Sequence, residues 1–90
     1  MSGLAELAAY VAALANAERN TNRAEDRTRY KNHLAAAALI FECLHRGDLV
    51  AAKAFVSEER RSFGWGYLDG DAGATAESAF STFAAFMDGF

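Results

Sequence analysis

The N-terminal part of the chain carries apolar residues at the spacing of one helix face. The residues that recur at intervals of three and four are Leu4, Leu7, Val11 and Leu14. This periodicity predicts an amphipathic helix over residues 3–18. Residues 20–22 read Asn-Thr-Asn, and side chains of this kind compete for backbone hydrogen bonds and favour turns. We therefore expect a turn there and an antiparallel hairpin with the next helix, with one long helix reaching residue 45 as the alternative.

A second helix is expected over residues 23–46, and its two halves differ. Residues 23–32 are almost entirely polar, whereas residues 33–44 are apolar on nearly every side, with His33 at the boundary. The face expected to point toward the first helix consists of Leu34, Ala37, Ala38, Phe41 and Leu44. Because a helix that is apolar all round is buried all round, a second copy of the chain is expected to cover what the other helices leave exposed.

A glycine and an aspartate separate the second helix from a third. Gly47 is a typical helix stop and Asp48 is a typical N-cap. The third helix is expected over residues 48–68, with Glu59 mostly on its solvent side. An end near Gly64 is the alternative, since each mid-helix glycine costs about 1 kcal/mol relative to alanine.

A fourth helix is expected over residues 74–88, with Thr75 as a candidate cap and Gly89 as its stop. The inward face of this helix is expected to consist of Ala76, Phe80, Phe83, Ala84 and Met87. With 90 residues, 52% of them hydrophobic, and no proline, the sequence predicts an all-α bundle of four helices. Residues 1–90 are expected to form one domain.

Net charge, the lengths of the apolar runs and the cysteine content indicate the compartment in which the protein is expected. The net charge is −3, and no apolar run reaches the roughly 18 residues that span a membrane. The first helix lacks the basic start of a signal peptide and contains Glu6. The single cysteine, Cys43, forms no disulfide within the chain and is expected to be a small buried apolar residue. A cytoplasmic protein is therefore expected.

The aromatic residues near the end of the third helix form the most conspicuous local pattern. They alternate with glycines in the stretch Phe63, Gly64, Trp65, Gly66 and Tyr67. Large aromatic side chains suit the centre of a protein interface, so we expect these residues, together with Phe86, to contact a protein partner. Trp65 could face its own core, a second subunit or solvent. The aspartates that follow do not make a calcium loop, because an EF-hand would require a glycine and a glutamate where the chain has Ala74 and Phe80.

One pair of residues has the spacing of a metal chelate. Glu42 and His45 form a Glu-x-x-His pair on one helix face, and di-iron bundles combine two such pairs with further glutamates. Glu6 or Glu18 would have to supply the additional ligand. The structural alternative is an interfacial Glu42 and a helix-capping His45. We expect no cofactor, with a divalent metal at this pair as the alternative.

A basic stretch raises a nucleic-acid alternative. Its cations include Arg23, Arg27, Arg29 and Lys31, which could contact phosphate oxygens. Acidic residues within the stretch and the net negative charge favour an ordinary solvated helix face instead, with Glu25 and Arg29 at favourable spacing for a pair.

The sequence as a whole favours interaction over catalysis. It contains no nucleotide-binding loop, paired-cysteine zinc motif or Ser-His-Asp order. We therefore expect a small, non-catalytic protein-interaction or regulatory module that acts as a homodimer. A metal-binding or small-ligand-binding bundle and a nucleic-acid-associated regulator are the alternatives.

Overall fold

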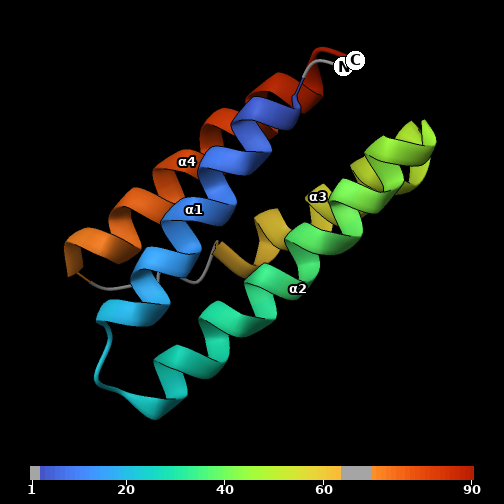
Figure 1. The fold of residues 1–90 in the computed structure, drawn as a ribbon. Coiled ribbons are helices and arrows are strands. Elements are labelled where there is room, and N and C mark those ends of the chain that lie inside the picture. Colours follow the sequence, from blue (N-terminus) through green and yellow to red (C-terminus); the bar gives the residue numbers. More distant parts are fainter. Residues whose placement is uncertain (1–2, 64–69) are drawn as a thin grey trace.

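The protein is an all-α bundle. A computed structural model describes residues 3–63 and 70–90, and within these ranges the chain forms four helices and no strands (Figure 1). The helices are α1 Leu4–Asn20, α2 Ala24–Arg46, α3 Leu49–Phe63 and α4 Gly70–Asp88. The fold class expected from the periodicity is therefore confirmed, as are the approximate bounds of the first two helices.

The helices pair unevenly around the core. α1 packs most extensively on α4 and also packs on α2, while α3 packs on α2 and makes few contacts with α4. Figure 1 shows α1 and α4 side by side, with the start of α1 beside the end of α4. The Cα atoms span 37 × 19 × 19 Å, so the bundle is about twice as long as it is wide.

A short turn separates α1 from α2, which settles the choice between a hairpin and one long helix. Thr21 leaves the helix with extended backbone angles, φ −85° and ψ 140°, and its N–H still donates to the carbonyl of Ala17. The carbonyl of Thr21 accepts a hydrogen bond from the guanidinium of Arg27 at 3.0 Å. This turn sends α2 back along α1 as the expected antiparallel hairpin (Figure 1).

The turn between α2 and α3 uses the glycine and the aspartate that the sequence marks. Gly47 is left-handed at φ 77°, a conformation that glycine adopts without a Cβ penalty. The N–H groups of Gly47 and Asp48 donate to the carbonyls of Leu44 and Cys43 at 3.1 and 2.8 Å, which is the Schellman arrangement. The Asp48 side chain accepts a hydrogen bond from the N–H of Ala51 at 3.1 Å and caps α3.

Replacing Asp48 with alanine is expected to lower the free energy of unfolding by about 1 kcal/mol, because the first turn of α3 loses its side-chain acceptor. Asparagine at the same position should retain nearly full stability, since it caps equally well. Chemical denaturation followed by circular dichroism measures both changes. Equal losses for the two variants would show that the cap contributes nothing.

α4 begins four residues earlier than expected. Thr75, the candidate cap, lies inside the helix, where its hydroxyl donates to the carbonyl of Asp71 at 2.8 Å. Gly70 and Gly73 are only weak helix breakers, and burial outweighs their cost, since Gly73 is buried and Ala72 packs against the core. The end of the third helix beyond Phe63, including the expected continuation to residue 68, lies outside the described residues.

The core agrees with the expected face of α4 and differs from the expected face of α2. All five inward residues of α4 are buried, and the helix ends before Gly89 as expected. On α2 the buried residues are Tyr30, His33, Ala37, Ile40, Cys43 and Leu44. Phe41, which was expected to point inward, is 48% exposed, and Leu39 is 45% exposed. Burial on all sides of α2 is therefore not achieved within one chain.

Candidate functional site

A hydrogen-bonded group of three polar side chains lies in the core. The carboxylate oxygen Oε2 of Glu59 accepts a hydrogen bond from the hydroxyl of Tyr10 at 2.5 Å and lies 2.8 Å from Nδ1 of His33. An ionised carboxylate only accepts, so in that state Nδ1 of His33 must carry a proton. The three residues come from α3, α1 and α2, and none is more than 4% exposed. We call them the Tyr10–Glu59–His33 network.

Each member of this network occupies a core position of its own helix. Tyr10 belongs to the row Leu7, Tyr10, Leu14 and Ala17. His33 belongs to the row Tyr30, His33, Ala37 and Ile40. Glu59 follows Ala52 and Val56 at spacings of four and three residues. The expectation that Glu59 faces solvent was therefore wrong. His33, at the boundary between the polar and apolar halves of α2, is buried as well. The signal that was missed is a polar residue in phase with an apolar row.

The burial of the network determines what it can do. Among the described residues, no buried side-chain nitrogen or oxygen is left without a hydrogen-bond partner, so the polar atoms of the network are satisfied. A buried ionisable group is strongly destabilising when its partner is lost. The arrangement therefore joins three helices in one alignment and penalises alternatives that would separate them.

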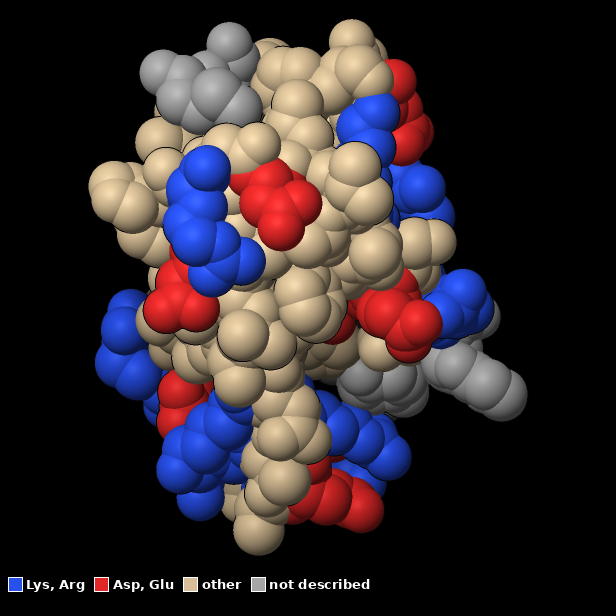
Figure 2. Space-filling model, turned by 90° about the vertical axis from the view of Figure 1, so that its right-hand side faces the viewer, with Lys and Arg blue, Asp and Glu red and all other residues tan. Residues whose placement is uncertain are grey.

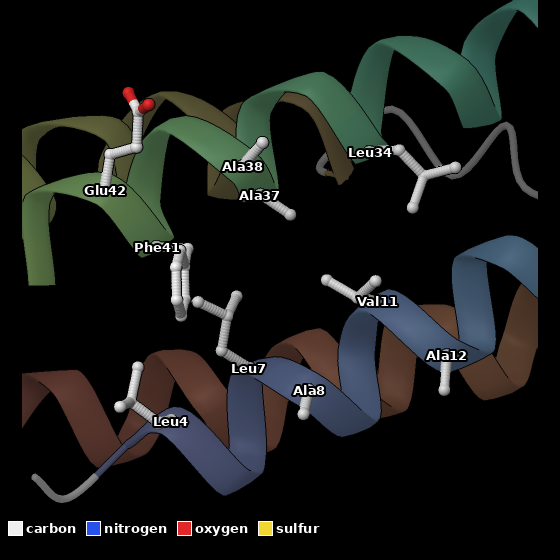
Figure 3. Close-up of a pocket in the computed structure, with 10 residues that line it drawn as sticks. All are labelled: Leu4, Leu7, Ala8, Val11, Ala12, Leu34, Ala37, Ala38, Phe41 and Glu42. Atoms are coloured by element: carbon white, nitrogen blue, oxygen red, sulfur yellow. The ribbon is translucent and has the colours of Figure 1, made fainter. Parts of the chain in front are cut away.

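An open apolar groove lies between α1 and α2. Its volume is about 630 Å³, and its lining consists of Leu4, Leu7, Ala8, Val11, Ala12, Leu34, Ala37, Ala38, Phe41 and Glu42. Figure 3 shows Leu7, Val11 and Phe41 pointing into the gap between the two helices, while Glu42 points away from it. Phe41 and Val11 are 48% and 36% exposed. We call this feature the α1/α2 groove.

A second apolar row on each helix creates the groove. On α1 the apolar part of this row is Leu4, Ala8, Val11 and Ala15, and Glu18 continues it. On α2 the apolar part is Leu34, Ala38 and Phe41, with Lys31 and His45 at its two ends. Each row is offset by about one residue from the core row, so it faces outward beside the contact between the helices. We call the two rows the outer rows. They account for the apolar surplus of α2 that the sequence showed.

The proposed metal pair lies at one end of this groove. Glu42 is at the rim, and the ring of His45 stacks on Phe41 with centroids 6.0 Å apart and planes 13° apart. Of the glutamates suggested as a third ligand, Glu18 pairs with Lys31 at 3.9 Å. Within residues 3–63 and 70–90, no group of three histidine, cysteine or acidic side chains comes together to hold a metal ion. Cys43 is buried, as expected.

The basic stretch is interleaved with carboxylates. Arg23 pairs with Glu25 at 2.6 Å and with Asp26 at 3.6 Å, and Arg29 pairs with Asp26 at 3.6 Å. The hydrogen bond and charge of Arg23 lower the pKa of Glu25 below its ordinary value, and the charge of Arg29 adds a smaller effect. The partner of Glu25 in the structure is thus mainly Arg23.

The other two cations of this stretch also have local partners. Lys31 contacts Glu18, and Arg27 donates to the carbonyl of Thr21. On the face drawn in Figure 2, lysine and arginine side chains lie beside acidic ones. This interleaving weakens the attraction for a phosphate backbone, which depends on uncompensated cations.

The expected aromatic interface falls largely outside the described residues. Gly64, Trp65, Gly66 and Tyr67 are not among them, and Phe63 is described only as the last residue of α3. Phe86 is half-buried, and its ring meets Phe90 edge-on with centroids 5.4 Å apart. It also lies against Gly3, where a Cβ atom would approach the ring to 3.3 Å. Phe86 thus has neighbours in its own chain.

In the described part of the chain, no helix combines the length and the apolar character that a membrane crossing requires. Comparisons with protein-family models, curated proteins and solved structures found no match.

Proposed function

We propose that the protein is a non-catalytic protein-interaction module and that the α1/α2 groove is its docking surface. The observation that carries this proposal is the exposure of apolar residues in the outer rows. Phe41 is about half exposed and Val11 about a third, and both lie in a groove lined almost entirely by apolar residues. Contiguous exposed apolar surface on a small protein commonly marks an interaction site.

The shape of the groove favours a helical partner. Two antiparallel helices leave between them a channel into which a third helix can place its apolar face. Ala8, Ala12 and Ala38 have small side chains, so the backbone of a partner can approach the backbones of α1 and α2 closely. Leu4, Leu34 and Phe41 supply larger apolar surface for contact.

Homodimerisation and a cytoplasmic setting are part of the same proposal. The uncovered apolar side of α2 supports self-association, and a single buried free cysteine agrees with a reducing compartment. Mixed surface charges and a net charge of −3 support a soluble module of this kind.

Site-specific photocrosslinking in host cells tests the docking surface. A benzophenone amino acid at Phe41 is expected to form discrete adducts with polypeptides, because this position lies in the groove. The matched control is Val50, which is 84% exposed and is not among the residues that line the groove. Absence of adducts from position 41, or the same adducts from both positions, would contradict the proposal.

A further inference from the structure

The outer rows have an approximate internal symmetry. On α2, Leu34 and Phe41 lie about one turn to either side of Ala38, and Lys31 and His45 lie two turns to either side. On α1, Val11 has the same central position between Leu4 and Glu18. Ala38 and Val11 both line the middle part of the groove (Figure 3).

This spacing suits a two-fold axis that passes near Ala38 and Val11. A two-fold axis lying in the interface and running across the helices lays α2 antiparallel on the α2 of the second copy and α1 on its α1, so that the two grooves face each other and their apolar side chains fill the space between them. Phe41 then meets the partner's Leu34, and small residues from both copies meet at the axis. Large residues flanking small ones allow the two backbones to approach while the flanks fill the groove.

Two opposite charges on α2, those of Lys31 and Glu42, are complementary under the same two-fold rotation. Glu42 is exposed at one end of the groove. Lys31 lies one turn beyond Leu34, past the other end, where its side chain is 64% exposed and pairs with Glu18 at 3.9 Å. Glu42 and Lys31 are separated by 11 residues, or about 16 Å along the helix. An antiparallel arrangement about this axis places Glu42 about one turn along the helix from the partner's Lys31, a gap that the long lysine side chain can span, and it does so twice. A parallel arrangement would bring like charges together. Opposite charges at an interface fix its register.

The size of the face is compatible with a reversible dimer. A whole side of the bundle, 37 × 19 Å in Cα extents, projects to roughly 700 Å², so an interface of the standard ~800 Å² per partner would have to use nearly all of this side. Only part of this face is apolar. The complex is therefore expected to dissociate on the order of micromolar concentrations.

From the symmetry, the charges and the area we infer that the occupant of the α1/α2 groove is a second copy of the chain, bound antiparallel with Glu42 beside the partner's Lys31. This inference rests on the proposed function and gives it a specific partner. It also assigns a role to Glu42 that needs no metal.

Sedimentation of the purified chain from about 1 to about 500 µM tests the inference. The mass is expected to rise from one chain to two across this range. Ala38→Glu should weaken association at least about tenfold, because it places two carboxylates near the axis. Ala54→Glu, the same change at an exposed site on α3, is the control and should leave association unchanged. Circular dichroism checks that both variants remain helical.

A charge exchange tests the register. Glu42→Lys and Lys31→Glu should each weaken the dimer several-fold, and the double variant should restore it, because the pairs between subunits are remade with reversed sign. Glu58→Lys on α3 controls for the change in net charge.

Three outcomes would overturn the inference. The chain could stay monomeric at every concentration, Ala38→Glu and Ala54→Glu could associate equally well, or the double charge variant could fail to restore dimerisation. Its failure is distinguishable from failure of the proposed function. Photocrosslinked adducts of Phe41 at twice the chain mass support self-association. Adducts only with other polypeptides would sink the dimer and leave the docking surface standing, and absence of any adduct would sink both.

Discussion

Replacing Glu59 with leucine is expected to lower the free energy of unfolding by about 3–5 kcal/mol, a large fraction of the ~5–15 kcal/mol that stabilises a small domain. The variant removes the acceptor shared by the Tyr10 hydroxyl and the His33 ring. Both groups remain buried, and a buried polar group without a partner costs far more than its hydrogen bond contributes. Urea denaturation followed by circular dichroism measures the loss.

Glu58→Leu provides a matched control on the neighbouring residue. Glu58 lies on the exposed side of α3, where its side chain is 69% exposed and pairs with Arg61. Its replacement should change stability by no more than about 0.5 kcal/mol. Similar losses for the two variants would mean that the network contributes nothing specific.

Removing the network as a unit separates two explanations of the loss. A variant with Tyr10→Phe, His33→Leu and Glu59→Leu should recover much of the stability lost in Glu59→Leu alone, because apolar groups of similar size often replace buried ion pairs at little cost. If the triple variant is stable but populates more than one helix alignment by NMR, the network serves mainly to specify the fold.

The parts of the fold that sequence alone predicted depend on local rules. Gly47 and Asp48 mark a turn through the conformational freedom of glycine and the capping ability of aspartate, and both features lie within a few residues of the chain. The inward face of α4 was predictable because its apolar residues leave one side polar. A local turn signal and a single apolar stripe each allow only one structural interpretation.

The parts that sequence alone did not predict depend on contacts between helices. Glu59 is next to Glu58 and Arg60 in a charged run, and its burial becomes meaningful only when Tyr10 and His33 arrive from α1 and α2. In α2 the apolar residues surround the helix, so periodicity could not decide which row packs inward. Two adjacent rows were available, and the one containing His33 forms the core, where Glu59 provides the hydrogen-bond partner of His33.

The same ambiguity explains why the candidate site in the structure differs from the predicted one. The sequence favoured the aromatic stretch around Trp65 as an interface, whereas the described residues form an exposed apolar groove beside Phe41 and Val11. Glu42 lines one end of an apolar groove, and the ring of His45 stacks on Phe41 in the same groove. Which row of residues remains exposed to solvent is decided only when the helices pack together in the bundle.

Phe83→Ala should lower the free energy of unfolding by about 3–5 kcal/mol, whereas Phe41→Ala should change it by less than about 1 kcal/mol. Both phenylalanines were expected to point inward, yet Phe83 is 0% exposed and Phe41 is 48% exposed. Denaturation must be measured well below the dissociation constant of any dimer, because self-association would add apparent stability by mass action. At higher concentration Phe41→Ala should lose stability relative to the unmodified chain, while the deficit of Phe83→Ala should stay about the same. A large deficit for Phe41→Ala in the dilute monomer would instead place this ring in the core, and the α1/α2 groove could not then be an open docking surface.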